Sequence, residues 1–287
     1  MNRQIIELYD DYTHGGMDRR EFLSRLARVA GGAAAASLLL PLLENRYADA
    51  ALVAPDDPSI MAGREHFDGP AGPVNAYVAW PVKSPERRAA VVVIHENRGL
   101  NAHIEDVARR LAKAGFAAIA PDALSGSGGT PANEDEARKL IGELNRDTAL
   151  GIYLAAVRHA TAHPHGHGKV GCVGFCWGGL MAGRLAANSK ELNASVVFYG
   201  MPPAAEEAAK VRVPMLLNYA GRDERINAAV PAFETTLKSI GARYELHTYP
   251  DVDHAFHNDT NAARYNADAA ALAWTRTVEF LSRELSA

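Results

Sequence analysis

Short apolar runs alternate with longer segments of helical spacing through most of the chain. The continuous Val/Ile/Ala runs are typical of strands that are buried on both faces of a sheet. We expect strands at 74–80, 90–95, 116–120, 170–175, 194–199, 213–219 and 244–249. Apolar residues at helical spacing predict helices at 104–114, 133–163, 177–187, 228–240 and 263–281. This alternation predicts one α/β domain, with a mainly parallel sheet and helices on both faces.

The first fifty residues do not follow this alternation. The pair Arg19-Arg20 is followed by Phe22 and then by a weakly charged Ala/Gly/Leu stretch at 26–43. Further on, residues 48–50 read Ala-Asp-Ala, the small-x-small pattern that a signal peptidase accepts. The apolar stretch is short and rich in Gly and Ala for a membrane span, and its flanks are those of an export signal.

This segment resembles a Tat signal peptide, which directs a folded protein across the inner membrane. We therefore predict a Tat-like signal peptide at 1–50 and a single α/β-hydrolase-type domain at 51–287, located in the periplasm. The Tat translocon would then be a transient partner. The alternative is an uncleaved amphipathic helix that docks on the domain or on a neighbouring protein.

Composition narrows the remaining classes of function. The chain has 287 residues and a formal net charge of -4, without a basic stripe, so nucleic acid is not an expected partner. Its two cysteines, Cys172 and Cys176, exclude a disulfide framework and lack the Cys-x-x-Cys spacing of a redox pair. His163, His165 and His167 lie in a polar loop, which we interpret as a solvated turn rather than a zinc site.

The segment Gly174-Phe175-Cys176-Trp177-Gly178 lies where a predicted strand turns into a predicted helix. This is the Gly-x-nucleophile-x-Gly elbow, with cysteine as the nucleophile. Glycines relieve crowding in the sharp turn, and the helix N-terminus favours a thiolate. The alternative is a packed, inert thiol.

A nucleophile of this kind needs a base and an acid later in the chain. Asp223 follows the strand at 213–219, and His254 follows the strand at 244–249. Both therefore lie at the carboxyl edge of the sheet, where α/β proteins build their sites. The order nucleophile, acid, histidine is that of the α/β-hydrolase fold. A loop aspartate is otherwise a common turn former.

Together, the segments 95–101, 106–122, 174–179 and 253–256 resemble the dienelactone hydrolase family. The resemblance implies an α/β-hydrolase fold and a triad of Cys176, His254 and Asp223. It also implies that Glu96 holds the resting thiol and helps to generate the thiolate. By the same resemblance, the backbone N–H groups of Asn97 and Trp177 form the oxyanion hole.

Two positions depart from the best-known members of that family. An apolar pair commonly follows the glutamate, whereas this chain has Asn97-Arg98. An arginine that binds a substrate carboxylate often follows the His-Ala-Phe motif, whereas here His257-Asn258 follow. Arg98 either replaces that carboxylate-binding arginine or is a surface charge, and we expect His257 to line the mouth of the site.

These observations predict a hydrolase that cleaves a small-molecule ester or lactone through an acyl-cysteine intermediate, without a cofactor or metal. The same fold acting on thioesters or phosphotriesters is the first alternative. A non-catalytic binding protein that uses the same pocket is the second.

Overall fold

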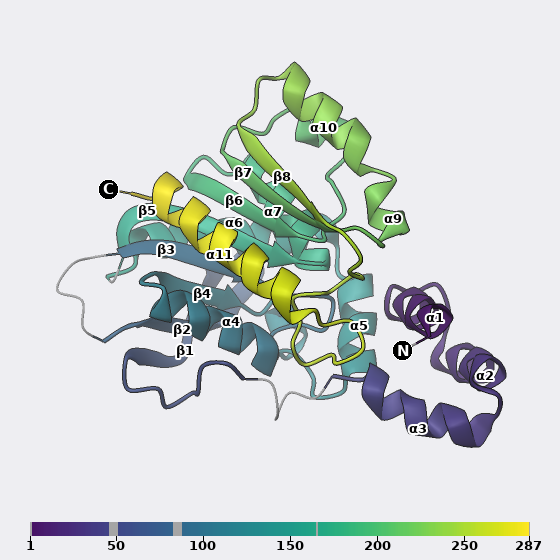
Figure 1. Ribbon diagram of the computed structural model, residues 1–287. Helices are drawn as coiled ribbons and strands as arrows, with labels where there is room; N and C mark the ends of the chain where they lie inside the picture. The colour runs from purple at the N-terminus through teal and green to yellow at the C-terminus, as the bar shows by residue number, and fades with distance from the viewer. Residues whose placement is uncertain (1, 46–50, 83–87, 165, 287) are drawn as a thin grey trace.

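The centre of the protein is an eight-stranded sheet with the strand order β1-β2-β4-β3-β5-β6-β7-β8 (Figure 1). The computed structural model describes residues 2–45, 51–82, 88–164 and 166–286. The strands are β1 (Ile60–Gly69), β2 (Gly72–Pro81), β3 (Arg88–Ile94), β4 (Ala117–Pro121), β5 (Gly166–Phe175), β6 (Leu192–Phe198), β7 (Met215–Ala220) and β8 (Tyr244–Tyr249). All neighbours from β4 to β8 are parallel, while β1 and β2 are antiparallel. The predicted mainly parallel sheet is confirmed.

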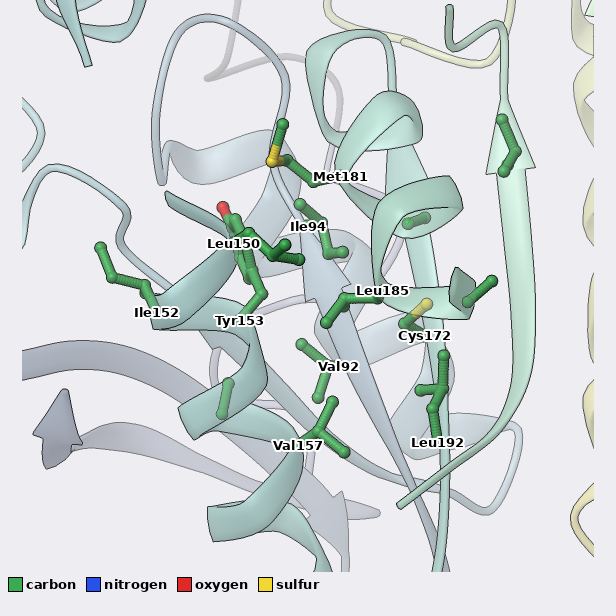
Figure 2. Close-up of a cluster of buried hydrophobic side chains, with 14 of the residues drawn as sticks. Val92, Ile94, Leu150, Ile152, Tyr153, Val157, Cys172, Met181, Leu185 and Leu192 are labelled. Atoms are coloured by element: carbon green, nitrogen blue, oxygen red, sulfur yellow. The ribbon is translucent and has the colours of Figure 1, made fainter. Parts of the chain in front are cut away.

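Helices cover both faces of the sheet. One face packs against α5 (Glu134–Glu143), α6 (Arg146–Ala162), α7 (Trp177–Asn188) and α10 (Val230–Ser239). The other packs against α4 (Ala102–Lys113) and α11 (Ala267–Glu284). Figure 2 shows the first interface, where Val92 of β3 lies between Val157 of α6 and Leu185 of α7. Burial on both sides explains why the central strands are apolar throughout.

The remaining short elements connect these layers. They are the 3-10 turn η2 (Ser125–Ser127) and the helices α8 (Ala205–Ala208) and α9 (Glu224–Asn227). The predicted helix at 133–163 is two helices, α5 and α6. Asn145 divides them because it caps the N-terminus of α6. Its side chain accepts hydrogen bonds from the backbone N–H groups of Asp147 and Thr148. Strand β1 was not predicted, because this edge strand carries polar side chains that mask its periodicity.

The N-terminal segment forms three helices, α1 (Arg3–Thr13), α2 (Arg19–Ala30) and α3 (Ala33–Leu43). They enclose a small apolar cluster of their own, in which the Tyr12 and Phe22 rings stack 4.5 Å apart. No single helix in the described part of the chain is long and apolar enough to cross a membrane. Only α2 and α3 taken together meet that test, and they are bent by 113° at the break between them.

These three helices dock on the domain beside α5 (Figure 1). Asp10 forms an ion pair with the buried Arg264 at 3.1 Å, and Arg19 forms one with Asp135 at 2.8 Å. The Asn261 side chain donates a hydrogen bond to the Leu43 carbonyl at 2.6 Å. The structure thus has the arrangement of the docked-helix alternative. Export stays a prediction, and the cleavage pattern at 48–50 lies outside the described residues.

Candidate active site

Cys176 lies in a strained turn between β5 and α7. Its φ of 55° and ψ of -115° are unfavourable for a residue with a side chain. The turn fits only because its neighbours lack side chains. A Cβ atom on Gly174 would overlap the Gly178 carbonyl, and one on Gly178 would overlap the Ile94 carbonyl. This turn presents Cys176 to a cavity at the carboxyl edge of the sheet.

Asp223 and His254 meet at the same edge, from the loops after β7 and β8. The Asp223 Oδ2 atom lies 2.5 Å from His254 Nδ1, and both side chains are buried. The other ring nitrogen, Nε2, is buried and has no hydrogen-bond partner among the described residues. A ring nitrogen of His254 lies within 4.8 Å of the Cys176 sulfur. The three predicted triad residues are therefore brought together.

The electrostatics of the site favour a thiolate. Burial opposes ionisation of Cys176, but the charges of His254 and His14 outweigh it and lower the thiol pKa to about 6. Burial likewise opposes a charge on His254, yet Asp223 and Cys176 raise the histidine pKa well above its usual value. Each group thus stabilises the charge on the other. By contrast, burial raises the pKa of the Cys172 thiol to about 12.

The predicted oxyanion donors, Asn97 and Trp177, both line the cavity. Trp177 is the first residue of α7, so its N–H group has no acceptor within the helix. Among the described residues, neither backbone N–H group makes a hydrogen bond to another backbone group. Both residues therefore line the same cavity as Cys176.

Glu96 is buried, but its partners differ from those that the resemblance implied. Its carboxylate accepts hydrogen bonds from Asn258 Nδ2 at 2.8 Å and from Tyr199 Oη at 3.4 Å. Burial opposes its ionisation, while His103 and Arg98 lower its pKa. The hydrogen bond of the Cys176 sulfur is made by His14 instead. A direct role of Glu96 on the thiol stays a prediction.

The structure corrects the predictions for Arg98 and His257. Arg98 is neither a surface charge nor part of the cavity lining, because its buried guanidinium binds Glu134 at 2.9 Å and Tyr9 at 3.3 Å. The His257 ring is 2% exposed and stacks on Phe175 with centroids 5.3 Å apart, away from the cavity. An aromatic core can accommodate a neutral histidine, and burial lowers the pKa of His257 well below its usual value.

His14, which follows α1, is a site residue that sequence reasoning missed. Its Nε2 atom lies 3.3 Å from Cys176 Sγ, and its ring meets the His254 ring edge-on at 4.6 Å. No motif marks His14, which lies in the segment 1–50 that resembles a signal peptide. Only the packing of α1 against the domain brings this imidazole to the sulfur.

The cavity between the N-terminal segment and the domain has a volume of about 1050 Å³, enough for a small-molecule substrate. Tyr12, Thr13 and His14 form one wall, and α5 and α7 contribute others. The Asn97 side chain donates a hydrogen bond to the Thr13 carbonyl at 2.7 Å. The N-terminal segment therefore forms part of the wall of the cavity that holds the nucleophile.

Residues 74–285, which hold Cys176, Asp223 and His254, match the family described as the dienelactone hydrolase family. The chain belongs to the dienelactone hydrolase family. Residues 1–32, which include the docked helices α1 and α2, match a separate family that is described as YqhI-like.

Similar proteins agree with this membership. An Escherichia coli (strain K12) protein with the provisional name carboxymethylenebutenolidase is 30% identical over 244 residues, 80% of this chain and 89% of that protein. A Saccharolobus solfataricus protein with the same provisional name is 32% identical, over 76% of this chain and 96% of its own length. A provisionally named hydrolase fragment of E. coli, YghX, is 50% identical over 104 residues, 36% of this chain and 89% of the fragment.

Solved structures show the same fold. A provisionally assigned dienelactone hydrolase from Klebsiella pneumoniae has a TM-score of 0.72 and 28% identity, covering 78% of this chain and 99% of that one. The dienelactone hydrolase-like promiscuous phosphotriesterase P91, from metagenomic libraries, has a TM-score of 0.71 and 25% identity, covering 79% of this chain and 100% of that one. This dienelactone hydrolase family member is thus an α/β-hydrolase-fold enzyme of the hydrolase class, consistent with carboxylic ester hydrolysis.

Proposed function

We propose that this family member hydrolyses a carboxylic ester or lactone through Cys176, His254 and Asp223. The observation that carries the proposal is the convergence of three strand ends. A strained elbow presents the thiol, and His254 lies between it and the carboxylate of Asp223. Relatives that bear the name carboxymethylenebutenolidase support a lactone among the substrates.

In the first step the Cys176 thiolate attacks the substrate carbonyl and forms a C–S bond. The carbonyl oxygen takes the negative charge, and the N–H groups of Asn97 and Trp177 stabilise it. Loss of a single donor of this kind typically costs roughly 3–4 kcal/mol of transition-state stabilisation. As the intermediate collapses, the C–O bond breaks and His254 Nε2 gives its proton to the leaving alkoxide.

In the second step water hydrolyses the acyl-cysteine. His254 Nε2 removes a proton from the water, whose oxygen attacks the thioester carbonyl. The C–S bond then breaks, the carboxylic acid leaves, and the thiolate–imidazolium pair is restored. Asp223 holds Nδ1–H throughout, so that Nε2 faces the reacting atoms. No step requires a cofactor or a metal.

The test follows turnover by the full chain, with a chelator present, on p-nitrophenyl acetate, a γ-lactone and a dienelactone. We expect Cys176→Ala to abolish turnover without unfolding the protein. The matched control is Cys172→Ala, which removes the other, buried cysteine and should leave turnover in place. Full activity in Cys176→Ala would overturn the proposal, as would wild-type inactivity on every ester and lactone tested.

A phosphotriester is the second candidate substrate class. It is favoured by the likeness to P91, which is described as a promiscuous phosphotriesterase. The same panel, extended by a p-nitrophenyl phosphotriester, ranks the two classes by kcat/KM. Turnover of either class that depends on Cys176 would exclude a non-catalytic binding protein.

We also propose that residues 1–50 direct export through the Tat translocon to the periplasm. The sequence pattern around Arg19 and Arg20 supports this proposal. Arg20 is exposed, whereas Arg19 holds Asp135, so Arg20→Gln removes one of the pair without touching that contact. Cell fractionation should show that Arg20→Gln stays in the cytoplasm. Equal periplasmic amounts of variant and wild type would contradict export by this route.

A further inference from the structure

Three side chains that can bind a metal converge at the nucleophile. The Cys176 sulfur, a ring nitrogen of His14 and a ring nitrogen of His254 all lie within 4.8 Å of one another. His14 Nε2 is already 3.3 Å from the sulfur. In a tetrahedral zinc site, neighbouring nitrogen and sulfur ligands are separated by roughly 3.3–3.6 Å, given the usual Zn–N and Zn–S distances. Small side-chain movements would bring all three to that spacing.

The hydrogen bonds on the far side of each ring show which nitrogen faces the sulfur. His14 Nδ1 lies 2.8 Å from the Asp10 carbonyl oxygen, and His254 Nδ1 lies 2.5 Å from Asp223 Oδ2. Both partners are acceptors, so each Nδ1 carries a hydrogen, and each ring presents an Nε2 lone pair to the sulfur whenever Nε2 is deprotonated. In the resting pair a single proton lies between the sulfur and His254 Nε2, and once it leaves, both Nε2 atoms and the sulfur can bind a cation. The buried His254 Nε2 has no other partner among the described residues.

From this geometry we propose that His14, Cys176 and His254 form a site for a thiophilic divalent cation such as Zn²⁺. Three protein ligands and one open position form a common zinc site, and thiolate with imidazole selects such a metal. The oxygens of Asp10 and Asp223 behind the two rings are the outer partners that metal-bound histidines usually have. The Asp10 carboxylate, 3.4 Å from His14 Nδ1, adds negative charge to the same side.

Metal binding at this site blocks the nucleophile. The proton of the Cys176–His254 pair is lost to solvent, and lone pairs of the sulfur and of the two Nε2 atoms form bonds to the cation, so one proton is released for each metal bound. The metal draws electron density from the sulfur and makes it a weaker nucleophile, and His254 Nε2 is no longer a base. The inhibition rests on the proposed function, whereas the binding of the metal does not.

The site depends on the docked N-terminal segment. Arg264 holds Asp10, and the Arg138 guanidinium lies 4.1 Å from the centre of the Tyr12 ring, so the residues just before His14 are anchored to the domain. A metal would tie the segment 1–45 to Cys176. If the chain is cut near residue 50, His14 leaves with the segment and the site loses one ligand.

A second cluster provides the control. Glu65, His159 and His163 also lie within 4.8 Å of one another, at the far end of α6. His163 was expected in a solvated turn, but it is 6% exposed and contacts Glu65 at 3.3 Å. This cluster has no sulfur ligand, so an optical signal from a metal–thiolate bond separates the two.

The experiment titrates Co²⁺, and then Zn²⁺ in competition, into the full chain. Wild type and His163→Gln should show the same sulfur-to-cobalt charge-transfer band at one metal per chain. Cys176→Ala should lose the band, and His14→Gln should bind more weakly by at least the roughly 10–100-fold that loss of an outer partner costs. Zn²⁺ should inhibit ester hydrolysis reversibly, and a chelator should restore it.

Absence of the band in wild type would overturn the proposal, as would equal affinity in His14→Gln and wild type. If the cobalt band is present but saturating Zn²⁺ leaves the rate of hydrolysis unchanged, the proposed inhibition by bound metal would be overturned. The cobalt band is read without any substrate, so failure of the proposed hydrolase activity does not affect it. A circular dichroism spectrum of His14→Gln that matches the wild-type spectrum would show that the variant is folded, so that weaker metal binding reflects the lost ligand.

Discussion

Alkylation of Cys176 across a range of pH tests the electrostatics of the site directly. Iodoacetamide reacts with the thiolate, so the rate reports the ionised fraction. His254 and His14 lower the Cys176 pKa to about 6. At pH 6 roughly half of this thiol is ionised, against about 0.3% of an ordinary cysteine with a pKa near 8.5. A low-pKa thiolate is also a weaker nucleophile, which removes about a factor of ten and leaves a rate advantage of roughly tenfold.

The assay compares wild type with Cys176→Ser, by mass spectrometry after short exposures between pH 5 and 9. Wild type should gain one label with a midpoint near pH 6. The variant should gain none, because Cys172 is fully buried and its pKa is about 12. His254→Gln should move the midpoint upward, because it removes the largest charge that opposes the effect of burial. His247→Gln, on the partly exposed strand β8, should not move it.

A wild-type midpoint at pH 8 or above would refute this reasoning, because the imidazole charges would then not overcome burial. Labelling of Cys172 in the folded protein would refute the burial argument in the same way. A midpoint that stays near pH 6 in His254→Gln would assign the effect to another group.

Three further predictions concern the triad, the elbow and the docked segment. Asp223→Asn should lower kcat by about 10²–10⁴-fold with little change in KM, because Nδ1 of His254 loses its acceptor; a loss under tenfold would contradict this. Gly174→Ala should cost several kcal/mol of stability in a urea titration, because its Cβ overlaps the Gly178 carbonyl, whereas Gly126→Ala, with open space around it, should cost little. Burial opposes ionisation of Asp10, but His254, His14 and Arg264 lower its pKa to about 2. Because this folded-state pKa lies below the ordinary value, Asp10 stabilises docking above about pH 4, and that contribution is lost as the pH falls toward 2. Limited proteolysis should therefore release the segment in that window in wild type, and already at neutral pH in Asp10→Asn; equal cleavage of the two proteins would contradict the prediction.

Much of the domain follows from local pattern. The Val/Ile runs of β3 and β5 mark strands buried on both faces, and alternation with helices leaves few topologies other than a parallel sheet. Cys176, Asp223 and His254 are recognisable because each lies just after a strand, at the edge where parallel strands end together. The edge strand β1 and the division between α5 and α6 are less visible, because the first lacks apolar alternation and the second rests on one capping asparagine.

The roles of side chains with long-range partners are decided by packing. Arg98 and His257 follow motif residues in the chain, so sequence proximity suggested a place in the site. Ion pairing with Glu134 and stacking on Phe175 hold them elsewhere. Glu96 is directed to Tyr199 and Asn258 in the same way.

By itself the sequence determined the fold class, the family and the three residues of the proposed triad, because these are encoded in local periodicity and in short motifs at strand ends. Only the tertiary structure decided what surrounds the thiol. His14 and Cys176 are 162 positions apart in the chain. Their contact depends on the ion pair between Asp10 and Arg264 and on the packing of α1 against the domain. No local pattern encodes such a contact, because its free energy comes from surfaces that meet only after the chain has folded.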